Sequence, residues 1–115
     1  MLPILLVDDD AAVRGLIKII LEGQGFHVIE AEDGLCALSA LHNLGGLLCL
    51  IVSDVRMPRL DGIGLCKRVK GEFPRIPVLL YSGDAPEALG VGDRFLEKPV
   101  HSDKLLSAVR ELVVN

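Results

Sequence analysis

The sequence predicts an α/β fold, a doubly wound parallel sheet with helices on both faces. Short apolar runs of strand length alternate with segments whose apolar residues recur every three or four positions. Strands that alternate with helices are joined by right-handed crossovers, which produce a parallel sheet covered on both sides. Three of the strand runs are almost continuously apolar, as expected for central strands buried on both faces. A chain of 115 residues, half of them hydrophobic, suffices for one core, so we expect a single domain over 1–115.

The first half of the chain is expected to alternate three strands with two helices. Strands are predicted at 4–7, 26–31 and 50–54, because these runs are β-rich or apolar and of strand length. Helices are predicted from Ala11 to the glycine at 23 and over 34–44, where apolar residues recur at helical spacing. The apolar positions of the two helices are Val13, Leu16, Ile17, Ile20 and Leu21 in the first and Leu35, Leu38 and Leu41 in the second.

The second half continues the alternation with one weak helix. A helix is predicted over 63–70, followed by prolines that end it, and strands are predicted at 78–81 and 94–96. The segment 85–92 is poorly patterned and holds at most one or two helical turns. Ser102 is expected to cap the last helix, which runs to the end of the chain at 113–115. The inner face of this helix is expected to consist of Leu105, Leu106, Val109, Leu112 and Val113.

Charge and composition argue against several classes of protein. The formal net charge is -4 and the basic residues are scattered, which argues against direct nucleic-acid binding. No apolar run reaches the roughly 18 residues of a membrane span, and no basic-then-apolar leader opens the sequence. Cys36, Cys49 and Cys66 lack C-x-x-C spacing and are expected to be reduced core residues. We therefore expect a soluble, cytoplasmic protein.

Charged and polar residues gather at the predicted carboxyl ends of the strands. Asp8 and Asp9 follow the first strand and Asp54 ends the third. Ser82 follows the fourth strand and Lys98 follows the fifth. The carboxyl ends of strands in an open parallel sheet meet at one edge, where ligands bind. The sequence therefore predicts one site at this edge, with Asp54 at its centre.

Three carboxylates, a hydroxyl and an ammonium in one place favour phosphoryl chemistry. The carboxylates repel one another by several kcal/mol at an effective dielectric constant of about 20, unless a cation lies among them. Hard oxygen ligands select Mg²⁺ or a similar ion such as Mn²⁺, which often also binds substrate phosphate. Asp54 can attack a phosphoryl group as a carboxylate nucleophile, while Lys98 and the Ser82 hydroxyl hold phosphoryl oxygens. The expected product is an aspartyl phosphate.

Four motifs follow the predicted strands in order, namely 7–9 (VDD), 54–62 (DVRMPRLDG), 82–83 (SG) and 98–99 (KP). Together they resemble the motif set of response-regulator receiver domains of two-component signalling. The resemblance covers essentially the whole chain. It implies a flavodoxin-like, five-stranded parallel sheet of order 2-1-3-4-5.

The resemblance also implies roles for the acidic residues. Asp54 would accept a phosphoryl group from a histidine kinase or a histidine phosphotransfer protein. Asp9, Asp54 and the backbone carbonyl of Arg56 would ligate Mg²⁺ directly, and Asp8 would act largely through water. The domain would then be a signalling switch with self-catalysed phosphoryl transfer and slow autodephosphorylation, not an enzyme, and it would act on a downstream effector.

The resemblance further implies a switch at the end of the sheet. Ser82 would be the switch hydroxyl, Phe95 the switch aromatic and Lys98 the phosphoryl contact beside a cis Lys98-Pro99 bond. Phosphorylation would change the loop 82–98 and the face of the fifth strand. The numbering advances by only 16 between Ser82 and Lys98 (98 − 82), fewer residues than receivers usually have, so the fourth helix is expected to be shortened. Whether this face still supports a weak homodimer or output to a partner is left open.

Each assignment has an alternative. Asp8 to Asp10 could simply cap the first helix, and Ser82-Gly83-Asp84 could be only a turn. Phe95 could be a plain core residue and Lys98 a solvated lysine. A phosphatase of the haloacid dehalogenase type also uses an aspartate nucleophile and Mg²⁺, but Ala12 replaces the hydroxyl residue of its D-x-D-x-T pattern. A degenerate receiver that only binds partners is a third class. The intact acidic pair at 8–9, together with Asp54, Ser82 and Lys98, argues against it.

Overall fold

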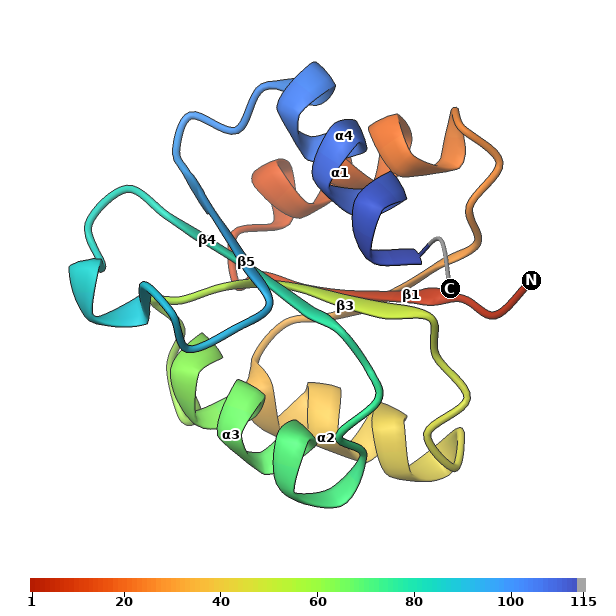
Figure 1. The fold of residues 1–115 in the computed structure, drawn as a ribbon, viewed down its shortest axis with the longest axis vertical. Coiled ribbons are helices and arrows are strands. Elements are labelled where there is room, and N and C mark those ends of the chain that lie inside the picture. Colours follow the sequence, from red (N-terminus) through yellow and green to blue (C-terminus); the bar gives the residue numbers. More distant parts are fainter. Residues whose placement is uncertain (114–115) are drawn as a thin grey trace.

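The computed structural model describes residues 1–113 as a five-stranded parallel sheet with helices on both faces (Figure 1). The strands lie in the order β2-β1-β3-β4-β5, so the predicted α/β class and strand order are confirmed. The strands are β1 (Ile4–Val7), β2 (Val28–Ala31), β3 (Leu50–Asp54), β4 (Val78–Ser82) and β5 (Arg94–Glu97). The helices are α1 (Ala11–Glu22), α2 (Gly34–Asn43), α3 (Gly62–Glu72), the 3₁₀ helix η1 (Pro86–Ala88) and α4 (Ser102–Val113). No helix within residues 1–113 has the length and apolarity needed to cross a membrane.

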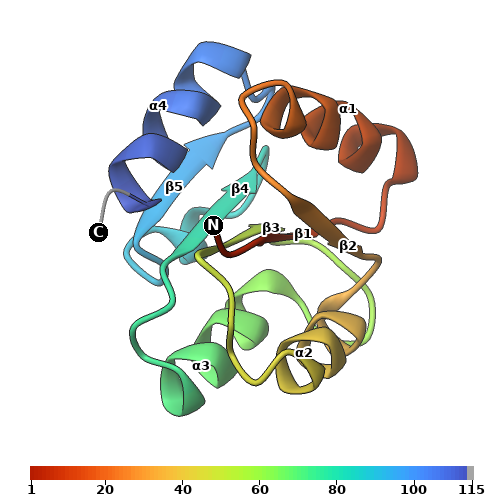
Figure 2. The ribbon, with the colours of Figure 1, turned by 90° about the vertical axis from the view of Figure 1, so that its right-hand side faces the viewer.

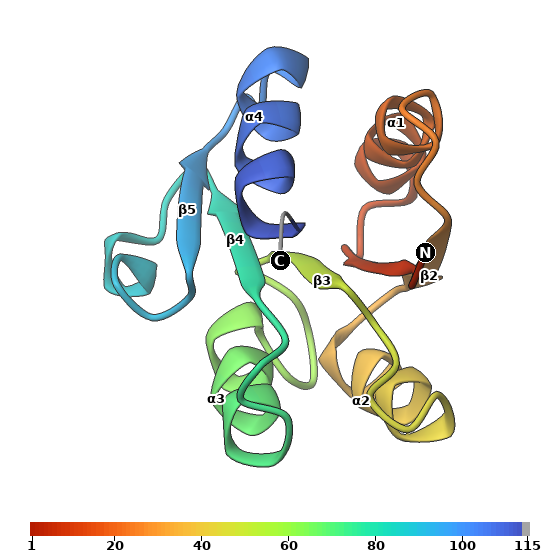
Figure 3. The same cartoon turned by 45° about the vertical axis from the view of Figure 1, so that its right-hand side comes forward.

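Two helices cover each face of the sheet. Helices α1 and α4 lie on one side, and α2 and α3 lie on the other (Figure 2 and Figure 3). Side chains alternate along each strand, so neighbouring residues enter different cores. Leu5 and Val7 of β1 belong to the core under α2 and α3, whereas Ile4 and Leu6 belong to the core under α1 and α4. Burial on both faces explains why β1, β3 and β4 are nearly continuous apolar runs.

Aspartates cap the first three α-helices and determine where they begin. The side chains of Asp10, Asp33 and Asp61 each accept a backbone hydrogen bond in the first turn of α1, α2 and α3, at 2.8 or 2.9 Å. Such caps satisfy N–H groups that have no partner inside the helix. All three aspartates lie at the same edge of the sheet as the carboxyl ends of the strands, since each of these helices follows a strand in chain order.

The last helix differs from its prediction at its first residue. Helix α4 begins at Ser102, so Ser102 is its first residue, and the prediction that it caps the helix was wrong by one position. The backbone carbonyl of the preceding residue, His101, accepts the Leu105 N–H at 2.9 Å. The last two residues of the predicted helix, 114 and 115, lie outside the described part of the chain.

The connection between β4 and β5 is short. Within the described residues it holds only the 3₁₀ helix η1 (Figure 1). This short helix is the fourth in chain order, so the prediction that the helix between Ser82 and Lys98 is shortened is confirmed. Pro86 opens η1, and Gly92 allows the chain to return close to β4. A Cβ atom at Gly92 would lie 2.9 Å from the carbonyl oxygen of Val78, which is closer than a side chain allows.

Some expectations about burial were wrong. Leu16 of α1 is 60% exposed and Leu35 of α2 is 46% exposed, although both belong to the apolar spacing that predicted these helices. The apolar pattern of each helix is wider than the stripe that meets the sheet, so spacing alone did not identify its edge. Cys66 is buried as predicted, but Cys36 and Cys49 are only half-buried.

Candidate functional site

The carboxyl ends of the strands bring the predicted residues to one edge of the sheet. Asp8 directly follows β1, Asp54 ends β3, Ser82 ends β4 and Lys98 directly follows β5. The Lys98 N–H donates to the Ser82 carbonyl at 3.1 Å, which joins the ends of β4 and β5. Residues that are far apart along the chain are therefore held together by the parallel pairing of the strands.

Asp8, Asp9 and Asp54 form an acidic cluster. One carboxylate oxygen from each lies within 4.8 Å of the others. Asp8 and Asp54 are 0% and 5% exposed, whereas Asp9 is exposed. The turn from β1 into α1 separates three consecutive aspartates, because Asp10 caps the helix and donates its own N–H to Asp8 Oδ1 at 2.8 Å. The capping alternative therefore applies to Asp10 and leaves Asp8 and Asp9 in the cluster.

Asp54 lies in surroundings that disfavour its negative charge. Its Oδ2 is 3.4 Å from the Lys98 Nζ, while its Oδ1 is buried and accepts no hydrogen bond from residues 1–113. Burial raises the pKa of the Asp54 carboxyl and the neighbouring Asp8 charge raises it further, although Lys98 acts in the opposite direction. A buried carboxylate oxygen without a partner costs free energy. We call Asp54 Oδ1 the open oxygen, because no hydrogen-bond donor within residues 1–113 contacts it. The crowded carboxylates and this open oxygen fit a divalent cation.

The Lys98 side chain reaches from the end of β5 into the cluster. Its Nζ pairs with Asp54 Oδ2 and lies 5.4 Å from the centroid of the Tyr81 ring. The peptide bond between Lys98 and Pro99 is cis, as predicted. Because its ammonium is paired, Lys98 is not simply a solvated lysine, and its contact with a phosphoryl group stays a prediction.

Ser82 and Phe95 line a cavity beside the cluster. Ser82 is buried, and its Oγ accepts the Asp84 N–H at 3.2 Å. The hydroxyl therefore takes part in the turn that was the alternative interpretation of this segment. Phe95 is half-buried and packs against the core under α2 and α3. The cavity has a volume of about 200 Å³ and gives space next to the Phe95 ring. The switch roles of both residues stay predictions.

The Arg56 side chain links the loop after β3 to the connection after β4. Its Nη2 and Nε donate to the Asp84 carbonyl at 2.5 and 3.1 Å, and its Nη1 pairs with Glu87 at 2.6 Å. The sequence did not predict this link, because the two loops are 28 positions apart along the chain. The predicted role of the Arg56 backbone carbonyl as a metal ligand stays a prediction.

Tyr81 is a site residue that the sequence analysis missed. Its side chain is fully buried, and its hydroxyl donates to Asp8 Oδ2 at 2.6 Å. Burial, and next the Asp8 carboxylate that accepts this bond, raise the pKa of the phenol well above its ordinary value. The available signal was a lone tyrosine in an apolar strand, since a buried phenol needs a hydrogen-bond partner.

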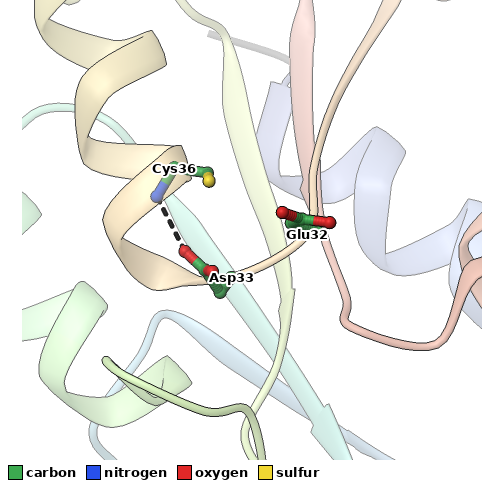
Figure 4. Close-up of side chains that lie close together, drawn as sticks. All are labelled: Glu32, Asp33 and Cys36. Carbon is green, nitrogen blue, oxygen red and sulfur yellow. Dashed lines mark hydrogen bonds between the residues drawn. The ribbon is translucent and has the colours of Figure 1, made fainter.

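A second group of potential metal ligands, Glu32, Asp33 and Cys36, lies at the start of α2 (Figure 4). Asp33 Oδ1 accepts the Cys36 N–H at 2.8 Å, and Asp33 Oδ2 accepts the Arg59 guanidinium, whose Nε is 2.8 Å away. The Cys36 N–H, and next the Arg59 side chain, hold the pKa of the Asp33 carboxyl below its usual range. Both oxygens of Asp33 thus have protein donors, and this group is a helix cap with an ion pair.

Comparison with known proteins identifies the family. Residues 4–110 match the family model of the response regulator receiver domain. The chain belongs to this family. This receiver domain is 40% identical over 117 residues to the transcriptional regulatory protein FixJ of Bradyrhizobium diazoefficiens, a match that covers 96% of the chain and 56% of FixJ. It is 35% identical over 117 residues to the sensor kinase CckA of Brucella abortus, with 96% of the chain and 12% of CckA covered. The chain therefore spans about half the length of the first relative and much less of the second.

A solved receiver structure has the same fold. The signal receiver domain of a signal transduction histidine kinase from Syntrophus aciditrophicus superposes with a TM-score of 0.90 at 33% identity, covering 99% of this chain and 91% of that one. Receiver domains belong to two-component regulators and sensor kinases, and they interact with histidine kinases and downstream effectors. They bind Mg²⁺ in an acidic pocket, and this receiver domain has the acidic cluster of Asp8, Asp9 and Asp54. Membership of the family implies phosphoryl acceptance and gives the phosphatase alternative no support.

Proposed function

We propose that this receiver domain is a phosphoryl-accepting switch of a two-component phosphorelay, with Asp54 as the phosphoacceptor. The observation that carries the proposal is the Oδ1 of Asp54, a buried oxygen to which no group within residues 1–113 donates a hydrogen bond. An oxygen without a donor is free to act as a nucleophile. The other Asp54 oxygen pairs with Lys98, which orients the carboxylate.

The donor in this proposal is a phosphohistidine on a histidine kinase or a histidine phosphotransfer protein. An Asp54 oxygen forms a bond to phosphorus, the phosphorus–nitrogen bond breaks, and the imidazole leaves with the electron pair of that bond. The Lys98 ammonium then binds phosphoryl oxygens. Asp9, Asp54 and the Arg56 backbone carbonyl would hold Mg²⁺ or Mn²⁺, with Asp8 acting through water. A bound cation would offset the charge of the carboxylates and the phosphoryl group.

The phosphorylated domain would differ in the loop 82–98 and in the face of β5. The Ser82 hydroxyl would turn from the Asp84 N–H to a phosphoryl oxygen, and the Phe95 ring would turn into the cavity of about 200 Å³ beside it. A downstream effector would read this change, with a weak homodimer as the alternative output. In this proposal the domain acts in the cytoplasm, binds neither nucleic acid nor membranes, and is a self-phosphorylating switch that slowly dephosphorylates itself, not an enzyme.

Labelling with acetyl phosphate and Mg²⁺, followed by intact-protein mass spectrometry, tests the phosphoacceptor. The native chain is expected to gain one phosphoryl group through an acid-stable, base-labile bond. Asp54→Asn should abolish the label, because an amide is a poor nucleophile. Asp84→Asn is the matched control, since it removes an exposed carboxylate at the same edge of the sheet and should leave the label intact. A label that persists in Asp54→Asn would remove the assignment.

A further inference from the structure

The Tyr81 side chain joins two members of the site that come from different strands. Its ring lies in the core under α1 and α4, together with Leu105 and Val109. Its hydroxyl donates to Asp8 Oδ2 at 2.6 Å. The Lys98 ammonium lies over the same ring, 5.4 Å from its centroid. The phosphoryl transfer proposed above assigns no role to this residue.

Asp8 is held at both carboxylate oxygens. Oδ1 accepts the Asp10 N–H at 2.8 Å, and Oδ2 accepts the Tyr81 hydroxyl. The Asp8 backbone is held as well, because Arg14 Nη1 donates to its carbonyl at 2.6 Å. An ionised carboxylate has about four acceptor positions, so these two donors leave others free for a ligand or a water. The cluster therefore combines one buried carboxylate in a fixed orientation with a second, Asp54, that keeps an open oxygen.

The hydroxyl of Tyr81 is what distinguishes this arrangement from ordinary core packing. A distance of 2.6 Å between the two oxygens is in the range of charge-assisted O–H···O⁻ bonds. A phenylalanine would fill the same space but would leave Asp8 Oδ2 without this donor, beside the charge of Asp54. Hydrogen-bond partners around a metal site orient the groups that serve the metal, and the loss of such a partner commonly weakens metal binding by about 10 to 100-fold.

We propose that Tyr81 is a positioning residue of this site, which holds the Asp8 carboxylate in the orientation that serves a divalent cation at Asp9 and Asp54. The inference rests on the proposed function. It adds that β4 contributes to the metal site through a buried phenol, in addition to the hydroxyl at its end. The ring, as distinct from the hydroxyl, supports the Lys98 ammonium.

The inference is tested by titrating the native chain and Tyr81→Phe with Mg²⁺. Binding is measured from ¹H–¹⁵N correlation spectra recorded at each Mg²⁺ concentration. This substitution removes the hydroxyl and keeps the ring under Lys98. The dissociation constant for Mg²⁺ is expected to rise about tenfold. Leu79→Val is the matched control, because Leu79 is buried on the same face of the same strand and has no polar group. The control should bind Mg²⁺ like the native chain.

The outcomes separate this inference from the proposed function. Native-like Mg²⁺ affinity in Tyr81→Phe, with normal binding by the native chain, would overturn the role of Tyr81 alone. An equal loss in Leu79→Val would overturn it too, because general loosening of the core would then explain the effect. A native chain that neither binds Mg²⁺ nor takes the label would overturn the proposed function, and the role of Tyr81 with it.

Tyrosine emission gives a second measurement that does not depend on Tyr81→Phe folding normally. The chain has one tyrosine and no tryptophan, so its emission reports on Tyr81 alone. A carboxylate that accepts the phenol hydrogen quenches this emission. Asp8→Asn should therefore raise it, and Mg²⁺ should change it in the native chain but not in Asp9→Ala. Emission that responds to neither Asp8→Asn nor Mg²⁺ would overturn the inference.

Discussion

At the scale of single residues, buried aspartates in this domain differ because their oxygens have different partners. Asp33 has protein donors at both oxygens, and its pKa is lowered. Asp54 has a single pairing with Lys98 and one open oxygen, and burial together with Asp8 raises its pKa. Burial opposes ionisation in both cases, so the donors decide the direction. The buried charge of Asp54 therefore costs free energy, because its open oxygen has no donor and Asp8 lies close by. A bound cation or a phosphoryl group can lower this cost.

We expect Asp54→Asn to stabilise the metal-free domain at neutral pH, by about 1 kcal/mol in the free energy of unfolding. The neutral amide removes both the repulsion with Asp8 and the cost of burying a charge. The lost Lys98 pair offsets little of this gain, because the lysine side chain is 34% exposed. Urea denaturation in the presence of a chelator measures the difference, with Asp84→Asn as the exposed control. A loss of stability in Asp54→Asn would show that the Lys98 pair outweighs the burial cost.

At the scale of elements, the loop after β3 is anchored to the start of α2. The Gly34 N–H donates to the Leu60 carbonyl at 3.2 Å, and a Cβ atom at Gly34 would lie 2.3 Å from that oxygen. Arg59, which has a positive φ of 69°, pairs with Asp33 at the cap of α2. This loop also carries Arg56, so the anchor at α2 holds the segment that follows Asp54 in place.

Asp33→Asn is expected to lower the free energy of unfolding by about 1 kcal/mol at neutral pH. Asparagine keeps an acceptor for the helix cap but loses the charge that pairs with Arg59. Because the folded-state pKa of Asp33 is lowered, its ionisation stabilises the fold above the ordinary pKa of aspartate. That contribution is lost as the pH falls through the lowered pKa, so the difference between the two chains should shrink as the pH falls below the ordinary pKa of aspartate.

Urea denaturation at neutral and acidic pH measures this dependence. Glu32→Gln is the matched control, since Glu32 is the exposed neighbour of Asp33 and its substitution should change stability little at either pH. If the cost of Asp33→Asn were the same at both pH values, the charge of Asp33 would not be its source.

At the scale of the whole molecule, one sheet both forms the buried apolar core and brings mutually repelling carboxylates together at its edge. Its strands are buried between two helical layers, which keeps their ends fixed relative to one another. The same strands deliver three carboxylates to one edge, where they lie within 4.8 Å of one another. The stability of the domain should therefore depend on what binds at that edge, because any ligand that binds only the folded state stabilises it.

Mg²⁺ is expected to raise the melting temperature of the native domain, with a dissociation constant in the micromolar-to-millimolar range. At about 100 times that constant, binding adds about 2.7 kcal/mol to the free energy of unfolding. Asp9→Ala should melt like the native chain without metal, since Asp9 is exposed, but it should lose the shift caused by Mg²⁺. Thermal unfolding with NaCl at matched ionic strength measures the shift. An equal shift in Asp9→Ala would place the cation elsewhere.

Much of the fold and of the site could be predicted because the signals are local. The apolar runs of β1, β3 and β4 and the aspartate that caps α1 can be read from a few adjacent residues. The exposed sides of α1 and α2 could not, since Leu16 and Leu35 continue an apolar pattern beyond the part that the sheet covers. The cap of α4 was also placed one residue too late. The reason there is different, because neighbouring polar residues offer similar capping signals.

The sequence by itself determined the order of strands and helices, the family motifs and the residues at each strand end, because these depend on periodicity and on short segments. Only the tertiary structure decided which side chains partner one another. The Tyr81 hydroxyl meets Asp8 across 73 positions of the chain, and Arg59 meets Asp33 across 26. Such contacts depend on which face each strand and loop presents after packing. For that reason the tertiary structure, and not the motif, leaves Asp54 with an open oxygen and holds Asp8 fixed beside it.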